Sequence, residues 1–476
     1  MAPNARRQLG TSDPLSYTCR CAAQESSPAE GSRGGGRVLL FYRYFSAEPV
    51  LLPQALPGGP NAVAQAQADF HSALTARLHL AGKIRVAAEG FNVTVGGTVA
   101  AIEAYMAACA AHWSFAGLPL ASAAERDAFF KPTPGCACVF GSGGGGSGGG
   151  PHVRVCAEIT PMGVTGYEPR AWSGMVEDLE PAEFHRRCVE EDVVLVDVRN
   201  HYESRIGYFV APRTCEIALR PAIRRFSQWP AYVRRHLGEV GRRSSREGEG
   251  GGDGRRPIMT YCTGGIRCEK ATRWMAENLA SDSAAAAAAA DANSDVDVGR
   301  TGICALKGGV AAYLTWMDAE IGAGRKRAEE SLYKGRNYVF DARGSLGLQN
   351  GATMPPVSRC HVCAAPSDRL SKCRSRGCHL VLVACEGCEA GDLRCCGSCR
   401  VLDEGVGVGD DGQGTMGISR AMCACEEARE RELWGGGLVR RLKGQGQGPR
   451  SGRRTAREKT QDLDIRVKIV EEASAS

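Results

Sequence analysis

The residues best suited to chemistry in this sequence form a short loop that begins at Cys262 and ends at Arg267. An apolar run at 258–261 precedes the loop and predicts a strand, and a helical segment follows from about Cys268. Glycines in the loop let the backbone curl with its amide N–H groups turned inward. Such amides, the positive end of a helix and the Arg267 guanidinium all favour a thiolate over a thiol. The loop residues between Cys262 and Arg267 are Thr263, Gly264, Gly265 and Ile266.

Cys262 is therefore predicted to be a nucleophile or a sulfur carrier, with Arg267 as its charged partner. The alternative is an inert buried cysteine in a tight turn. Cysteine phosphatases place one more residue between Cys and Arg, and the smaller ring here suits a sulfur atom carried as a persulfide. A second thiol, Cys268, is either a resolving cysteine or the first buried residue of the helix, and the second interpretation is favoured because free cysteines are commonly buried.

Two charged residues, Asp197 and Arg199, follow a valine-rich run at 193–196. Such a run is typical of a buried parallel strand, and functional groups lie just past the carboxyl ends of such strands. The pair is interpreted either as support for the Cys262 loop or as a structural ion pair at the strand end.

The C-terminal region is rich in cysteine, with nine of the 22 cysteines between Cys360 and Cys399. Paired knuckles at this spacing suit tetrahedral thiolate coordination of two zinc ions, which would supply much of the folding energy of this segment. His361 and His379 are possible substitutes, and the alternative is a set of free or disulfide-linked thiols. The predicted ligands are Cys360, Cys363, Cys373, Cys378, Cys385, Cys388, Cys396 and Cys399.

The elements that must position these residues fall into several units, as expected for 476 residues. The order of strands and helices in 38–160 predicts a small ferredoxin-like α+β domain, with a strand at 91–95 that stops at Gly96-Gly97. Alternating strands and helices in 175–330 predict an α/β domain with a parallel sheet flanked by helices. A cysteine-rich segment at 331–400 and a low-complexity basic tail at 401–476 follow.

Low-complexity stretches at 141–150, 238–256 and 281–295 are expected to be flexible inserts in surface loops, or a linker in the case of 141–150. The tail carries eight Lys or Arg residues between 440 and 459, and the formal net charge of +6 permits a nucleic-acid partner. No apolar run is long enough for a membrane span. Residues 1–37 are expected to be a disordered terminus or an organellar transit peptide, which places the protein in the cytoplasm or in an organelle.

Several short strings occur in the order found in one family. They read EGFN at 89–92, VDVRN at 196–200, YCTGGIRCEK at 261–270, LKGGV at 306–310 and VFDAR at 339–343. The third string resembles the rhodanese active-site loop. The whole set resembles the bacterial tRNA wobble-uridine hydroxylases, a branch of the rhodanese-domain proteins, and covers about residues 38 to 400.

This resemblance implies an acylphosphatase-like N-terminal domain, a rhodanese domain and a cysteine-rich C-terminal segment. It implies that Cys262 is the active cysteine and that wobble uridine in tRNA is converted to 5-hydroxyuridine with molecular oxygen as co-substrate. In rhodaneses the position of Asp197 and Arg199 holds a charged pair near the active loop. Sulfur transfer from a small donor such as thiosulfate to a thiol acceptor remains an alternative, as does an RNA-binding module, although the intact Cys262 argues against the latter.

Overall fold

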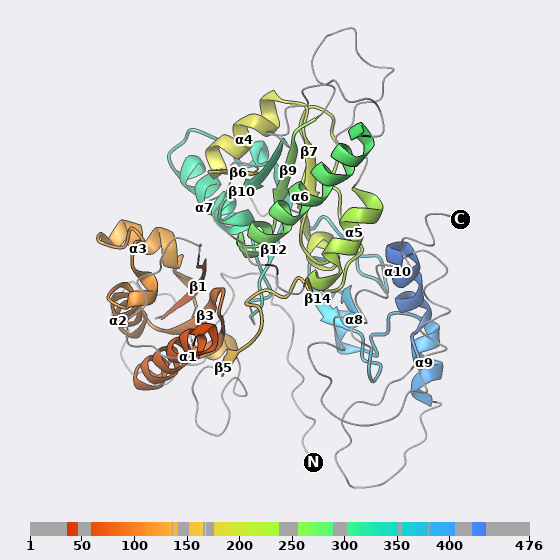
Figure 1. The fold of residues 1–476 in the computed structure, drawn as a ribbon. Helices are drawn as coiled ribbons and strands as arrows, with labels where there is room; N and C mark the ends of the chain where they lie inside the picture. Colours follow the sequence, from red (N-terminus) through yellow and green to blue (C-terminus); the bar gives the residue numbers. More distant parts are fainter. Residues whose placement is uncertain are drawn as a thin grey trace.

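The computed structural model arranges the chain as an N-terminal α+β part, a central α/β domain and a cysteine-rich C-terminal part (Figure 1). The expected fold class is confirmed. The structure describes residues 36–45, 59–135, 137–140, 152–164, 167, 176–237, 256–288, 302–341, 343–350, 355–378, 380–404 and 421–434. The predicted insert at 141–150, all of the predicted insert at 238–256 except Arg256, the N-terminal 1–35, His379 and the basic stretch at 440–459 lie outside the described residues.

The N-terminal part is a five-stranded sheet in the order β4-β1-β3-β2-β5. The strands β1 and β2 both pair antiparallel with β3, and an aromatic core that includes Phe41, Phe91 and Phe115 lies against the helices. Its strands are β1 Gly36–Tyr44, β2 Ala81–Ala87, β3 Gly90–Thr98, β4 Thr133–Pro134 and β5 His152–Val155, and its helices are α1 Gly59–Arg77, α2 Val99–Ala110 and α3 Ala123–Phe130.

Successive side chains of β1 lie on opposite faces of the sheet, so only every second one can contact the central domain. Leu39 and Phe41 are buried in the N-terminal core, so Leu40, Tyr42 and Tyr44 lie on the opposite face of the strand.

The strand predicted to stop before Gly96-Gly97 instead continues through both glycines to Thr98. The prediction was wrong because these glycines belong to the ladder. A Cβ on Gly97 would lie 2.4 Å from the Leu80 Cδ2 atom, so glycine there reflects close packing rather than a turn.

The central domain is a four-stranded sheet in the order β6-β10-β9-β7, with every neighbouring pair parallel. Helices α4 and α7 cover one face and α5 and α6 the other (Figure 1). The strands are β6 Val176–Leu179, β7 Val194–Asp197, β9 Ile258–Tyr261 and β10 Ile303–Leu306. The helices are α4 Pro181–Glu190, α5 Trp229–His236, α6 Ile266–Ala288 and α7 Gly309–Gly322.

Helix α6 differs from its predicted form at both ends. It begins at Ile266, inside the loop, and it continues through Ala288, into the stretch predicted to be a flexible insert from 281 onward. That part of the prediction was wrong because alanine, which fills 284–288, has the highest intrinsic helix propensity.

The C-terminal part consists of short elements that pack against the central domain. Strand β11 pairs with β8, and α10 contributes Leu433 to the apolar cluster beneath α5 and α6. Helix α10 falls in the segment predicted to be a low-complexity tail, and sequence reasoning missed it. Strand β8, Gly207–Phe209, belongs to the central domain. The elements of the C-terminal part are β11 Tyr333–Gly335, β12 Asn337–Tyr338, β13 Ser345–Leu346, β14 Leu370–Lys372, β15 Val381–Val383, α8 Glu386–Ala390, α9 Gly397–Glu404 and α10 Ala424–Trp434.

Five single-turn 3-10 helices complete the described elements. They are η2 Trp113–Phe115, η3 Ala137–Phe140, η4 Glu203–Arg205, η5 Phe226–Gln228 and η6 Ala328–Glu330. Among the described residues, no helix combines the length and the apolar character that crossing a membrane requires.

Candidate active site

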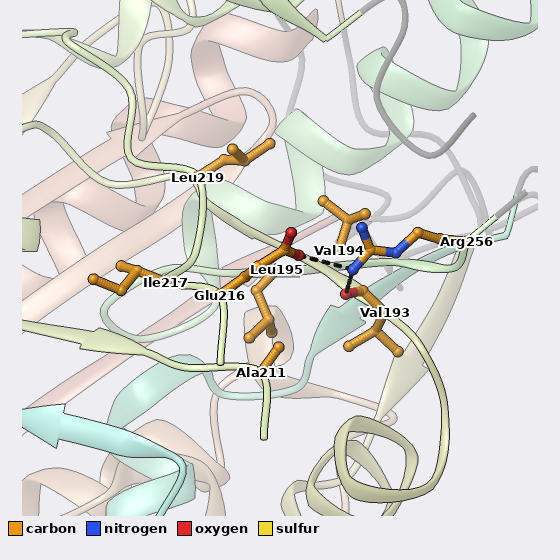
Figure 2. Close-up of a pocket in the computed structure, with 8 residues that line it drawn as sticks. All are labelled: Val193, Val194, Leu195, Ala211, Glu216, Ile217, Leu219 and Arg256. Carbon is orange, nitrogen blue, oxygen red and sulfur yellow. Dashed lines mark hydrogen bonds and ion pairs between the residues drawn. The ribbon is translucent and has the colours of Figure 1, made fainter. Parts of the chain in front are cut away.

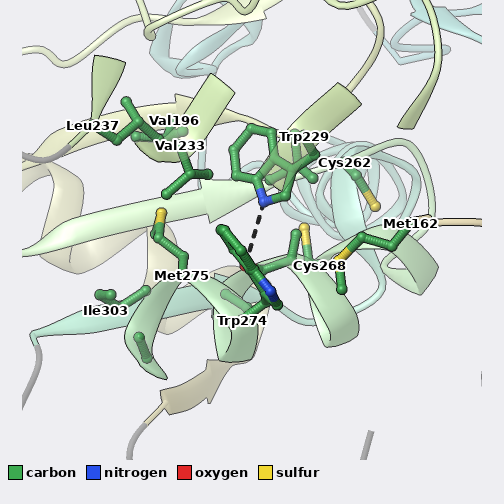
Figure 3. Close-up of a cluster of buried hydrophobic side chains, with 14 of the residues drawn as sticks. Met162, Val196, Trp229, Val233, Leu237, Cys262, Cys268, Trp274, Met275 and Ile303 are labelled. Carbon is green, nitrogen blue, oxygen red and sulfur yellow. Dashed lines mark hydrogen bonds between the residues drawn. The ribbon is translucent and has the colours of Figure 1, made fainter. Parts of the chain in front are cut away.

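The predicted nucleophile, Cys262, follows β9 at the carboxyl edge of the parallel sheet and has no exposed surface. Its side chain lies with Cys268, Met162 and Trp229 in a cluster of buried side chains (Figure 3). The Gly265 amide donates a hydrogen bond to the Cys262 Sγ atom at 3.2 Å, so a loop amide does turn inward. Gly265 has a φ of +98°, a conformation that favours glycine.

The surroundings of Cys262 stabilise its thiolate. Burial by itself would raise the pKa of the thiol, but a hydrogen bond from Cys268, the charge of Arg267 and the backbone amides of both residues lower that pKa to about 5. Burial and the neighbouring Cys262 raise the pKa of Cys268 well above its ordinary value. The two thiols are therefore unequal: one is a thiolate at neutral pH and the other is a proton donor to it.

Arg267 is held in place by a carboxylate that sequence reasoning did not select. Its two terminal nitrogens each donate to Glu203 at 2.7 Å, and the Thr263 hydroxyl donates to the same carboxylate at 2.8 Å. Burial raises the pKa of Glu203, but Arg267 outweighs it and the pKa stays below its ordinary value. Glu203 fixes Arg267 beside the loop, and it follows Asp197 by six residues in the sequence.

The backbone at the start of α7 packs against the Cys262 loop and donates hydrogen bonds to it. The Val310 amide donates to the Cys262 carbonyl at 2.9 Å, and the Ala311 amide donates to the Thr263 carbonyl at 3.0 Å. Gly309, with a φ of +63°, passes so close that a Cβ there would lie 2.4 Å from the Cys262 carbonyl oxygen. The glycines of the LKGGV string thus let the start of α7 pack directly against the loop.

The pair Asp197 and Arg199 lies at the same sheet edge but does not touch Cys262. It is a fully buried ion pair with N–O distances down to 2.6 Å, and Arg199 also donates to the Tyr333 hydroxyl at 3.1 Å. Asn337 links the pair to the loop, because Arg199 donates to its side-chain oxygen at 3.5 Å and its amide donates to the Thr263 carbonyl at 3.4 Å. The pair is therefore an ion pair at the end of a strand, and it also contacts the Cys262 loop indirectly, through Asn337.

The N-terminal domain covers the Cys262 loop with the outer face of β1. A Cβ on Gly265 would lie 2.6 Å from the Tyr42 hydroxyl, and one on Gly264 would lie 3.8 Å from Leu40. The Tyr44 hydroxyl donates to the Ile266 carbonyl at 3.1 Å. Residues from two domains therefore enclose the thiolate, and sequence reasoning did not select any of these β1 residues.

Two further ionisable groups face this enclosure. Lys131, at the end of α3, lies near Gly308, and burial lowers its pKa while the charge of Cys262 opposes that change. Glu269, on the first turn of α6, is hydrogen-bonded to Tyr42. Burial, together with the charges of Asp178 and Cys262, raises the pKa of Glu269 to about 7. A carboxyl group that titrates near neutrality beside a thiolate can exchange protons during a reaction.

A buried lysine joins the two domains next to the loop. Lys270 Nζ lies 2.7 Å from Glu89 and 2.8 Å from Glu158, and the lysine side chain has no exposure. Arg343, from the VFDAR string, donates to the Thr133 hydroxyl at 2.7 Å and to the Pro134 carbonyl at 3.1 Å. These contacts place the N-terminal domain over Cys262.

A pocket at the other edge of the sheet offers no comparable chemistry. Figure 2 shows Arg256 between Glu216 and the Val193 carbonyl, at 2.9 Å from each. The pocket adjoins the start of β7, and its lining is mainly apolar with no cysteine or histidine. We therefore place the candidate active site at Cys262.

The cysteines of the C-terminal part gather as two groups, each able to hold a metal ion. The first contains Cys360, Cys363, Cys385 and Cys388, as two predicted pairs. In the second, Cys373, Cys378 and Cys399 lie with Cys395, which was not among the predicted ligands. Cys395 is buried, and the predicted Cys396 lies with Cys395, Cys399 and Cys423 in a further set that could hold a metal ion. Adjacent cysteines could not be distinguished by spacing alone. His361 instead contacts the Cys395 carbonyl at 2.8 Å.

Comparisons with known protein families match the N-terminal domain and the cysteine-rich C-terminal part. A family model described as a UPF0176 acylphosphatase-like domain matches residues 36–133, and one described as rhodanase C-terminal matches residues 334–400. The tRNA uridine(34) hydroxylase of Bacillus mycoides is 28% identical over 77% of this chain and 89% of its own length. Those of Enterococcus faecalis and Listeria welshimeri are also 28% identical, over 76% and 77% of this chain and 88% and 89% of their own lengths.

The chain thus combines an N-terminal segment that matches an acylphosphatase-like domain, a central domain with a parallel sheet, and a C-terminal segment that matches a rhodanase C-terminal domain. It is homologous to the tRNA uridine(34) hydroxylases, and this homology supports a rhodanese-family enzyme of that kind.

The hydrogen bond from Cys268 gives a direct test of the thiolate. We expect the alkylation rate of Cys262 by iodoacetamide to be half-maximal near pH 5, and to fall as the pH drops below it, because only the thiolate reacts. Cys268→Ala removes the donor and should move this midpoint to higher pH, whereas Cys268→Ser keeps a hydroxyl donor and should leave it nearly unchanged. Peptide mass spectrometry gives the rates at each pH. A midpoint near the free-thiol value of roughly 8.5 in the wild type would contradict the thiolate.

The interdomain lysine gives a second prediction. Lys270→Met leaves two carboxylates without their buried cation and should lower the free energy of unfolding by about 3 to 5 kcal/mol. It should also speed alkylation of Cys262, because the N-terminal domain would no longer be held over the loop. Lys307→Met is the matched control, since Lys307 pairs with Glu180 in an exposed ion pair worth about 1 kcal/mol or less. Denaturant unfolding of both variants measures the difference, and equal effects would show that Lys270 does not join the domains.

Proposed function

We propose that this protein hydroxylates the wobble uridine of tRNA to 5-hydroxyuridine, with molecular oxygen as co-substrate and Cys262 as the reacting residue. The observation that carries the proposal is the buried Cys262 thiolate, which two domains enclose and whose pKa is about 5. Homology to the tRNA uridine(34) hydroxylases supports the choice of substrate.

The chemistry of the site suits a covalent role for Cys262. A thiolate can add to C6 of a uracil ring, which makes C5 nucleophilic toward oxygen, and it leaves again when the ring is restored. One oxygen atom of O₂ enters the base and the other becomes water, so the reaction consumes two electrons and two protons, which we assign to an external thiol reductant. Arg267 would keep the thiolate charged, and Glu269 would exchange the protons.

The enclosure favours a base from single-stranded RNA. Cys262 lies beneath Tyr42 and Leu40, so a reacting base must leave its stack and enter between the two domains. An anticodon loop can turn out one base at modest cost, which a duplex does less readily. We propose that basic residues of the chain hold the tRNA phosphates, and binding should therefore weaken steeply as salt is raised.

A second candidate function is sulfur transfer from a small donor. The specific observation in its favour is the short loop, whose Gly265 amide lies 3.2 Å from the Cys262 sulfur and could equally donate to a persulfide. In that case Cys262 would carry a sulfane sulfur from a donor such as thiosulfate to a thiol acceptor.

We further propose that the two C-terminal cysteine groups bind zinc. Four thiolates at mutual distances compatible with one ion are the usual ligand set of a structural zinc site. Ligands of this kind must stay reduced, which favours a reducing compartment such as the cytoplasm or an organelle matrix.

Nucleoside mass spectrometry distinguishes the two candidate functions. Wild-type protein should restore 5-hydroxyuridine to tRNA from a bacterial strain that lacks the homologous hydroxylase, and Cys262→Ser should restore none. Cys188→Ser is the matched control, because Cys188 is a buried thiol on α4 whose pKa burial raises, and it should keep at least half of the activity.

If the wild type restores no 5-hydroxyuridine but transfers sulfur from thiosulfate to cyanide at an enzyme-like rate, the sulfurtransferase function replaces the hydroxylase function.

A further inference from the structure

The second cysteine group holds more sulfur atoms than one metal ion can use. Besides the four-cysteine set of Cys373, Cys378, Cys395 and Cys399, the structure brings together a set made of Cys395, Cys396, Cys399 and Cys423. In each set all ligand atoms lie within 4.8 Å of one another. The sets share two cysteines, so six sulfur atoms form two tetrahedra with a common edge.

The distances within the group match metal–thiolate geometry. For a Zn–S bond of about 2.3 Å, the sulfur atoms of a tetrahedral site lie about 3.8 Å apart. Cys373 and Cys399 are 3.8 Å apart, and so are Cys378 and Cys395. On the other side, Cys395 lies 3.7 Å from Cys396 and 3.4 Å from Cys423. Both sets are thus close to the size that a zinc ion requires.

The shared edge is the shortest of these distances. The Sγ atoms of Cys395 and Cys399 are 3.2 Å apart. Two thiolates this close repel each other, and either a shared proton or cations on both sides of them remove that repulsion. Bridging thiolates in a four-membered metal–sulfur ring are drawn together in this way, because each is bonded to both ions.

We propose that this group is a binuclear zinc–thiolate cluster, in which Cys395 and Cys399 bridge the two ions. Cys373 and Cys378 complete one ion, and Cys396 and Cys423 complete the other. Six thiolates and two divalent ions carry a net charge of −2, the same as one zinc ion with four thiolates. The chain then binds three zinc ions in all. The inference rests on the zinc binding proposed above and is independent of the hydroxylase function.

The additional ligand Cys423 would connect helix α10 to the central domain. Cys423 immediately precedes α10, whose Glu426 accepts from the Cys423 amide at 3.0 Å and lies 3.7 Å from Arg224 in an ion pair. Leu433, near the end of α10, packs with Trp229 of α5. The second ion of the cluster would therefore fix α10 between the cysteine-rich part and the α5 face of the central domain.

Native mass spectrometry of the full chain tests the cluster. Purified wild type should carry about three zinc ions, and Cys423→Ala and Cys396→Ala should each carry one fewer. Cys425→Ala is the matched control and should keep all of them, since the Cys425 thiol donates to the Cys395 carbonyl at 3.2 Å and belongs to neither set.

The outcomes separate the proposals. Two ions in wild type and in Cys423→Ala would overturn the binuclear cluster while leaving zinc binding intact, and no bound metal would overturn both. Neither result bears on 5-hydroxyuridine formation by the wild type. If an alanine variant does not fold, ¹¹³Cd NMR of the substituted wild type decides instead. It should show three resonances, two of them coupled to the same cysteine protons of Cys395 and Cys399, and two uncoupled resonances would refute the bridge.

Discussion

A thiolate without access to water is the constraint on which this structure depends. Removing a charge from water is unfavourable unless the protein supplies donors and opposite charge in its place. Around Cys262 the Gly265 amide, the Cys268 thiol and the Arg267 guanidinium do so. Arg267 is itself buried and needs its own counter-charge, which Glu203 provides. The charges therefore alternate in sign from the Cys262 thiolate to the Arg267 guanidinium and then to the Glu203 carboxylate. Each group is held in position by the next one in this series.

The enclosure needs both domains, which explains why the short strings of the sequence lie so far apart along the chain. Glu89 of the N-terminal domain meets Lys270, eight residues beyond Cys262, and Arg343 reaches back to Thr133. The glycines at 308 and 309 support the loop from the opposite side. All these strings converge on one site, because a buried charge must be surrounded on every side. The acylphosphatase-like domain is therefore part of the enclosure around Cys262 and not an appendage of the central domain.

The sequence predicted the parts of the structure that depend on local pattern. Strand β9 has the predicted bounds, because a mainly apolar run followed at once by a glycine-containing loop leaves little choice of boundary. The roles of Tyr42 and Glu203 could not be predicted, since tertiary contact alone brings them to Cys262 and Arg267. Cys395 was missed for a similar reason: two adjacent cysteines have nearly the same spacing, and only packing shows that both belong to sets that could hold a metal ion.

The cysteine-rich part is connected to the active site through packing. Strands β14 and β15 place Leu370 and Val383 against Ile206, which directly follows the single turn η4 that carries Glu203. The cysteine groups flank these strands and pack with buried leucines. Metal binding would therefore supply the free energy that keeps β14 and β15 in place. Because Glu203 positions Arg267, and Arg267 helps to keep Cys262 ionised, the order of the cysteine-rich part extends to the reactivity of the thiolate.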